Sequence, residues 1–390
     1  MIIYRYFNQF VSNSKSAGIL LLILVLISLC IANSSFANSF QHVLDYQIGT
    51  EILHLKYPIS VWINDGLMAI FFLYVGLEIK RELLRGELAD IRQAALPIVA
   101  AFGGMVFPAV IYLIFNHNTS YADGWAIPMA TDIAFSLAII SMLGKNIPTS
   151  LKIFLSALAI VDDLGAIIVI ALFYTDSIDW VSLGICGGIT IFLIILNKTG
   201  IKNLLFYLVP GLLLWYFMHH SGIHATIAGV ILAFTIPLKN PANKISPSEK
   251  LKKQLHLPVS FLIMPLFALV NTNITFEKDI FSHFISPLSK GIILGLFAGK
   301  VLGTNILSWL AIKIKWAKLP ANCSFKDMIG VGFLAGIGFT MSIFVALLAF
   351  PKDFESQNIS KISILAASVI SGVTGYIILR YRKSGIRHTA

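Results

Sequence analysis

The sequence predicts an all-α integral membrane protein of about 12 transmembrane helices, with inverted-topology three-helix repeats and two broken helices. The prediction rests on composition, on the spacing of apolar segments and on the placement of charges. Of the 390 residues, 57% are hydrophobic and 12% are charged, and the mean hydropathy is +0.83. Soluble domains carry about 25% charged residues. This composition excludes a soluble globular protein.

Apolar segments recur along the whole chain. A bilayer core about 30 Å thick needs about 20 apolar residues per helix. Twelve segments fit this template, and the first, preceded by Arg5 and Lys15, is read as a span because so many follow it. We expect one membrane transport domain over 1–390, with no strands beyond a hairpin in 45–58. The segments are centred near residues 25, 70, 105, 132, 163, 188, 210, 230, 263, 300, 338 and 370.

Basic residues are distributed unequally between the two sides of the membrane. If both termini are cytoplasmic, 23 of the 29 Lys and Arg residues fall inside, five fall outside and Lys300 lies within a span. Cytoplasmic loops carry such an excess, so we expect both termini to be cytoplasmic. The basic residues stand singly or in small groups between apolar runs, so no nucleic-acid partner is expected. The three cysteines, which show no ligand spacing, indicate neither a disulfide framework nor a zinc site, and no cofactor is expected.

Four charged residues interrupt the apolar segments near mid-depth. Asp162 and Asp163 stand between two apolar runs of eleven residues, and neither run could span a bilayer alone. Asp132 and Lys300 are placed centrally in their segments in the same way. A charge at the bilayer centre costs about 3 kcal/mol or more, so such residues are functional candidates.

Three carboxylates and one ammonium leave an excess of negative charge at this depth. One interpretation is a set of neutralised salt bridges that only holds helices together. The excess instead favours a cation site, since oxygen ligands suit hard ions such as Na⁺ and Li⁺. Neighbouring carboxylates also titrate as a coupled pair within reach of cellular pH. A proton and a metal cation would then compete for one place.

Two segments contain residues that break helices. Pro128 precedes Asp132, and four glycines crowd the segment near 338. Glycines in membrane helices also serve close packing, but here both sets fall at mid-depth. Segment centres near 105, 132 and 163 recur near 300, 338 and 370, and units of three spans must have opposite orientations in the membrane. The sequence therefore predicts an inverted repeat with an interrupted helix in each half.

Several polar residues near the ends of spans are candidates for a response to pH. Glu78, Arg81 and Glu82 end the second segment, where a solvated helix end with local ion pairs is an equal alternative. His224 and His256 are lone histidines near span ends. Such histidines are more often hydrogen-bonded structural residues, but histidine also titrates near neutral pH.

Five blocks of this sequence resemble the NhaA sodium/proton antiporters. They follow one another in order from the second to the eleventh segment, so the resemblance extends over effectively the whole chain. The blocks read FFLYVGLEIKREL (71–83), ATDIAF (130–135), VDDLG (161–165), GIHATIAG (222–229) and GIGFTMSIF (336–344).

The resemblance implies a transporter of the bacterial cytoplasmic (inner) membrane that exchanges Na⁺ or Li⁺ for H⁺ by alternating access, and not an enzyme. Asp163 and Asp162 would bind the ion, Thr131 and Asp132 would lie where the two broken helices cross, and Lys300 would pair with one aspartate. Inverted-repeat transporters place ions at such broken helices, and NhaA is itself one of the proteins on which that generalisation rests.

The resemblance also implies that two groups of helices have different roles. Core helices within about 95–175 and 287–382 would move against interface helices within about 15–93 and 180–272. A homodimer would be assisted by the loop before the second segment. The chain departs from the family at the cytoplasmic mouth, where Lys252 and Lys253 precede His256. These lysines are expected to repel an approaching cation.

Three other functions fit the sequence less well. An intramembrane aspartyl protease takes its aspartates from two helices, one of them in a G-x-G-D motif, whereas Asp162 and Asp163 are neighbours. A sodium-coupled symporter for an organic anion would need a more basic pocket. A passive channel does not need competing binding of protons and cations. The paired aspartates further predict more than one proton per Na⁺, and hence electrogenic exchange, because an uncompensated buried charge is costly.

Overall fold

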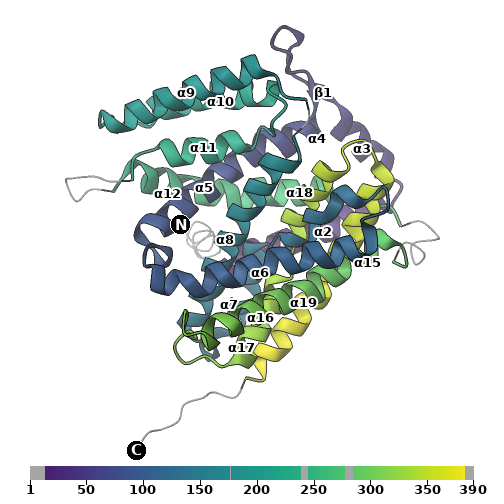
Figure 1. Cartoon of the computed structure of the whole chain (residues 1–390). Helices are drawn as coiled ribbons and strands as arrows, with labels where there is room; N and C mark the ends of the chain where they lie inside the picture. Colours follow the sequence, from purple (N-terminus) through teal and green to yellow (C-terminus); the bar gives the residue numbers. More distant parts are fainter. Residues whose placement is uncertain (1–13, 176, 239–244, 277–283, 383–390) are drawn as a thin grey trace, which may run out of the picture. The chain divides into compact units, whose positions relative to one another are not determined.

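The computed structural model describes residues 14–175, 177–238, 245–276 and 284–382. These residues are mostly helical, as the sequence predicts (Figure 1). Residues at both ends, for which we predict a cytoplasmic location, lie outside the described ranges, at 1–13 and 383–390.

The number of spans differs from the expected 12. Within the described ranges, eight helices are long and apolar enough to cross a membrane, or up to ten if each of two bent helix pairs is one span. The segments expected near 210 and 230 are missing from this set. There the structure has α10 (Leu205–His220) with 16 residues and α11 (Ile227–Thr235) with nine. Both are shorter than the roughly 20 residues that a single helix needs to span a bilayer.

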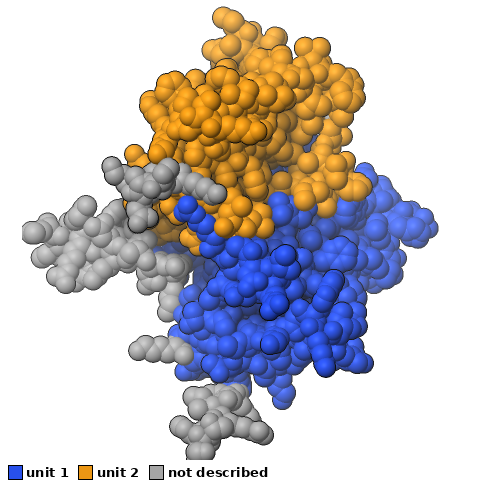
Figure 2. Space-filling model, turned by 60° about the vertical axis from the view of Figure 1, so that its left-hand side comes forward, with its two compact units in different colours: residues 1–19, 85–166, 276–390 blue, residues 20–84, 167–275 orange. Residues whose placement is uncertain are grey.

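The chain divides into two compact units, each built from segments far apart in the sequence (Figure 2). Of the described residues, unit 1 takes those within 1–19, 85–166 and 276–390, and unit 2 takes those within 20–84 and 167–275. Two helices are divided between the units, α2 (Ser14–Ala32) and α8 (Thr149–Phe173), and the last residue of a third, Arg85 of α5 (Met68–Arg85), also belongs to unit 1.

In unit 1, two helices from opposite halves of the chain lie side by side (Figure 1). They are α6 (Ile91–Asn116) and α16 (Lys300–Lys313). A Cβ atom on Gly103 would lie 2.1 Å from the carbonyl oxygen of Gly303, and one on Gly303 would lie 2.0 Å from that of Gly103. Only glycine permits so close an approach of two backbones.

Both predicted helix interruptions are confirmed in unit 1. The first span runs as a 3₁₀-helix, η4 (Ala122–Met129), then as extended backbone, and then as α7 (Ile133–Met142). The second bends by 46° between α17 (Phe325–Ala335) and α18 (Phe339–Ala349). The breaks meet, because the backbone N–H of Asp132 donates to the carbonyl of Ile337 at 2.6 Å.

The remaining elements of unit 1 connect or cover these helices. They are η3 (Glu87–Ala89), η5 (Gly144–Asn146), α15 (Pro287–Leu294), the π-helical η7 (Gly295–Gly299) and α19 (Phe354–Arg380).

Unit 2 consists of helices around an apolar core that includes Leu77, Tyr207, Leu214 and Leu232. The hairpin predicted within 45–58 is confirmed, with β1 (Gln47–Ile48) antiparallel to β2 (Tyr57–Pro58). Besides α10 and α11, the helices of unit 2 are α3 (Ala37–Asp45), η1 (Glu51–Leu53), α4 (Ile59–Val61), η2 (Trp62–Leu67), α5 (Met68–Arg85), α9 (Trp180–Lys198), α12 (Pro247–Pro258), η6 (Val259–Ile263) and α13 (Met264–Asn271).

Candidate cation-binding site

A buried ion pair joins two helices of unit 1, α8 and α16. Lys300, the first residue of α16, donates from Nζ to Oδ2 of Asp162, which lies near the middle of α8. Both side chains are 0% exposed. Removing two charges from water costs several kcal/mol per ion, which good geometry and further hydrogen bonds must offset. The pair predicted from the resemblance is therefore formed, and Asp162 is the aspartate involved.

The break between η4 and α7 supplies a further hydrogen-bonding group next to this carboxylate. Thr131 Oγ1 lies 2.7 Å from Asp162 Oδ2 and 2.8 Å from the carbonyl oxygen of Ala335, the last residue of α17. A hydroxyl has one proton and two lone pairs. It can therefore donate to only one of these oxygens at a time, and its own oxygen remains available to a cation.

The other oxygen of Asp162 has no donor. Oδ1 is buried and accepts no hydrogen bond from the described residues. The neighbouring Asp163 is 2% exposed. A buried acceptor without a donor is costly, and a proton or a hard cation would satisfy it. The residues around Asp162 thus suit the binding of either.

Asp132 is stabilised in a different way. Its Oδ1 accepts from the backbone N–H of Phe135 at 3.1 Å, and its Oδ2 accepts from the backbone N–H of Thr340 at 3.2 Å and from the Thr340 hydroxyl. The carboxylate therefore lies at the N-terminal ends of both α7 and α18, where helix dipoles stabilise a negative charge. Lys300 and these two helix ends compensate two different aspartates.

The acids do not all converge on one point. Among the side chains that the structure describes, no three His, Cys, Asp or Glu residues come together as ligands of one metal ion. Asp162, Thr131 and Lys300 are in contact, whereas Asp132 is bound at the start of two helices. Ion binding by Asp162, Asp163, Thr131 and Asp132 stays a prediction.

Comparison with known proteins identifies the family. The family model described as Na⁺/H⁺ antiporter 1 matches residues 8–379. The chain belongs to this family. It is 54% identical over 378 residues to the Na⁺/H⁺ antiporter NhaA 2 of Flavobacterium johnsoniae, covering 96% of this chain and 92% of that protein. It is 46% identical to NhaA 1 of Klebsiella pneumoniae, covering 98% of each, and 45% identical to NhaA of Escherichia coli, covering 97% and 98%.

The sequence reasoning that pointed to the Na⁺/H⁺ antiporter family missed two residues that shape the site. Thr340 binds Asp132, although its motif was noted only as part of the resemblance. Gly104 of α6 faces the ion pair, and a Cβ atom there would lie 3.6 Å from Lys300 Cδ and 3.7 Å from Asp162 Oδ1. The pair Gly103-Gly104 within an apolar run was an available signal, since small residues mark close helix contacts in membranes.

The charged and polar residues that the sequence placed near the cytoplasmic surface contact one another in unit 2. Lys252 Nζ donates to Glu78 Oε1 at 2.8 Å, and Arg81 donates to Glu82 at 2.6 Å. His256 Nδ1 lies 3.2 Å from the hydroxyl of Tyr74. Because Glu78 compensates Lys252, the repulsion of cations expected from this lysine is reduced. Their part in a pH response stays a prediction.

Lys80, near the end of α5, is not solvated as a lysine at the end of a helix usually is. It is buried, and its ammonium donates to the carbonyls of Phe234 at 2.7 Å and Ile236 at 2.5 Å, next to the end of α11. A cation at a helix C-terminus satisfies carbonyls that lack intrahelical donors. Lys80 thereby holds α11 against α5.

His224 lies in the connection between α10 and α11. Its Nδ1 is 3.0 Å from Thr226 Oγ1, and its Nε2 is 3.9 Å from an oxygen of Asp65. Burial lowers the pKa of His224 to about 4. The imidazole is therefore mostly neutral at neutral pH, and its predicted role in a pH response stays a prediction.

Gly104→Ala is expected to destabilise the protein. The added Cβ would lie 2.9 Å from Thr304 Cγ2, so either α6 must shift or Thr304, whose hydroxyl donates to the carbonyl of Lys300, must change its rotamer. Overpacking of this kind costs about 1 to 3 kcal/mol. The measurement is thermal unfolding of the purified protein in detergent.

Gly187→Ala in α9 is the matched control. The added methyl group would meet no other heavy atom within 4 Å. Alanine is also the better helix former, so this variant should unfold at or above the wild-type temperature. Equal unfolding temperatures for the two variants would contradict the close packing at Gly104.

Proposed function

We propose that the protein is a sodium/proton antiporter that exports Na⁺ in exchange for H⁺. Relatives named Na⁺/H⁺ antiporters, which are transporters, match nearly the whole chain and support this pair of ions. The observation that carries the proposal is the fully buried Asp162, which contacts Lys300 and Thr131 where two broken spans meet. Li⁺ is a hard cation of the same charge and is expected to be a second substrate.

We propose that Na⁺ and H⁺ compete for the aspartates of this site. Asp162 and Asp163 would supply carboxylate oxygens to Na⁺, and Thr131 and Asp132 would complete or support the site. A Na⁺ ion beside Asp162 would repel the ammonium of Lys300, which contacts the same carboxylate. Sodium binding would then weaken the Lys300–Asp162 pair. Lys300, like the two aspartates, is thereby a candidate carrier of an exchanged proton.

Alternating access would follow from motion of unit 1, which holds the site, against unit 2. Unit 1 contains both broken spans and all four of the charged residues predicted at mid-depth, which supports its role as the transport core. Unit 2 contains the hairpin β1–β2 in the loop before α5. We propose that this hairpin assists a homodimer, as the family resemblance implies.

The excess of basic residues on one side supports a cytoplasmic location for both termini in a bacterial inner membrane. Two exposed lysines test this orientation. Lys253→Cys should react with an impermeant thiol reagent only from the cytoplasmic side, and Lys352→Cys only from the outside. The reverse labelling pattern would overturn the proposed topology.

Asp162→Asn and Asp163→Asn are each expected to reduce Na⁺/H⁺ exchange to the level of protein-free vesicles. Asparagine keeps the size of the side chain but can neither be ionised nor take up the exchanged proton. The measurement is Na⁺-driven proton movement in proteoliposomes that contain equal amounts of protein. Glu355→Gln, which neutralises an exposed acid at the start of α19, is the control and should exchange normally. Normal exchange by Asp163→Asn would contradict the proposed site.

Exchange is expected to be electrogenic, with more than one proton per Na⁺. If Lys300 loses its proton when Na⁺ binds, release of Na⁺ leaves two buried negative charges, and the uptake of only one proton would leave one of them uncompensated in the membrane. Moving one net charge across a membrane potential of 100 mV changes the free energy by about 2.3 kcal/mol. A potential that is negative inside should therefore drive Na⁺ out without a pH gradient. Proteoliposomes preloaded with labelled Na⁺, under a potassium diffusion potential, provide the measurement. Efflux that ignores the sign and size of the potential would show electroneutral exchange.

A further inference from the structure

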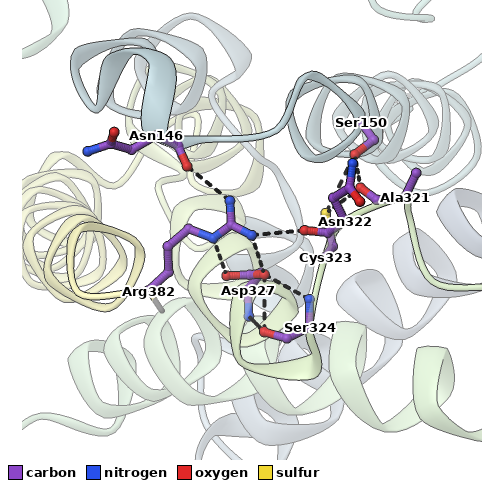
Figure 3. Close-up of polar contacts among 8 residues, drawn as sticks. All are labelled: Asn146, Ser150, Ala321, Asn322, Cys323, Ser324, Asp327 and Arg382. Atoms are coloured by element: carbon purple, nitrogen blue, oxygen red, sulfur yellow. Dashed lines mark hydrogen bonds and ion pairs between the residues drawn. The ribbon is translucent and has the colours of Figure 1, made fainter. Parts of the chain in front are cut away.

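One arginine just after α19 binds two separate segments of unit 1, the end of η5 and the start of α17 (Figure 3). Arg382 Nε donates to Asp327 Oδ1 at 3.1 Å, and Nη2 donates to Asp327 Oδ2 at 3.2 Å. The same guanidinium donates to the carbonyls of Asn146 at 3.0 Å and Asn322 at 2.9 Å. The two charged side chains are 9% and 3% exposed. Such a planar fork of donors is a property of arginine and not of lysine.

These contacts lie at or next to the ends of helices. Asp327 closes a capping box with Ser324 and so begins α17, while Asn146 ends the short connection that follows α7. Ser150, near the start of α8, donates to the carbonyl of Ala321 in the same cluster at 2.6 Å. Arg382 thus joins the outer ends of α7 and α17 to the end of α19.

The inner ends of α7 and α17 form the candidate cation site. Helix α7 starts at the Asp132 cap, and α17 ends at Ala335, whose carbonyl faces Thr131. Next to this contact, Ser136 donates to the carbonyl of Leu334 at 2.7 Å. Each helix has only 10 or 11 residues and is therefore about 15 Å long. A tilt or slide of either helix at its outer end therefore moves oxygens of the site at its inner end.

We propose that Arg382 is a positioning residue for cation binding, which sets the register of α17 against α7 from the far end of both helices. The inference rests on the proposed function. It assigns to Arg382 no contact with the ion. Loss of the fork should change the spacing between Thr131 and the Ala335 carbonyl, and with it the affinity for Na⁺.

The test measures the KM for Na⁺, the maximal rate and the pH profile of exchange in proteoliposomes. Arg382→Gln is expected to raise the KM for Na⁺ by about two- to thirtyfold, the range usual for mutations that act on a site at a distance. It should also shift the pH at half-maximal activity, because Na⁺ and H⁺ compete. A purely structural role would lower only the amount of active protein, and so only the maximal rate.

Arg380→Gln is the matched control. It removes the same charge at the same end of α19, but Arg380 is exposed, and within the described part of the chain it contacts Tyr376 of its own helix, through a hydrogen bond to the hydroxyl and a contact over the ring. Its KM and pH profile should equal those of the wild type. If Arg382→Gln behaves like Arg380→Gln, the positioning role is wrong. If the wild type itself shows no exchange, the proposed function fails instead.

Arg382→Lys separates geometry from charge and serves also if Arg382→Gln does not fold. Lysine keeps the charge but lacks the planar fork of N–H donors. The KM of this variant for Na⁺ should therefore still exceed the wild-type value. A wild-type KM and pH profile in Arg382→Lys would contradict the proposal.

Discussion

The buried pair of Asp162 and Lys300 is the interaction on which the rest of the site depends. An isolated charge in this position would be costly, and the pair becomes tolerable only because each charge compensates the other. Helix α6 also approaches α16 closely beside the pair, as the contact of Gly104 with Lys300 and Asp162 shows. Gly103, Gly104 and Gly303 allow α6 and α16 to do so, since side chains at these positions would collide with the opposite helix. In the proposed exchange, a cation that binds Asp162 would compete with the ammonium of Lys300 for the same carboxylate.

The two broken spans solve a second electrostatic problem. Helix ends expose unpaired backbone groups, which are costly inside a membrane unless they are satisfied. Here the N-terminal ends of α7 and α18 bind the carboxylate of Asp132, and the end of α17 receives the hydroxyl of Thr131. The breaks therefore hold a negative charge without a lysine. They also leave oxygens at a depth where a regular helix would offer none.

The features predicted from sequence are those that a local pattern determines. Charges within apolar runs indicated Asp162 and Lys300, and Pro128 and the glycines near 338 indicated the breaks. The count of spans was less successful, because apolar stretches near 210 and 230 form helices that are too short to span alone. The burial of Lys80 and the contacts of Arg382 could not be predicted, since both depend on carbonyl groups that only the folded chain brings near. Ion binding by Asp162 and Asp163 remains a prediction.

The central claim is that Na⁺ and H⁺ exchange for one another at the same buried carboxylates. The most direct test is to add Na⁺ to purified protein in a weakly buffered detergent solution and to record the pH, with Asp162→Asn, Asp163→Asn and Glu355→Gln alongside. The account predicts that the wild type and Glu355→Gln release protons in proportion to bound Na⁺, whereas the two aspartate variants release none. Sodium that binds and stabilises the wild-type protein without releasing protons would contradict it.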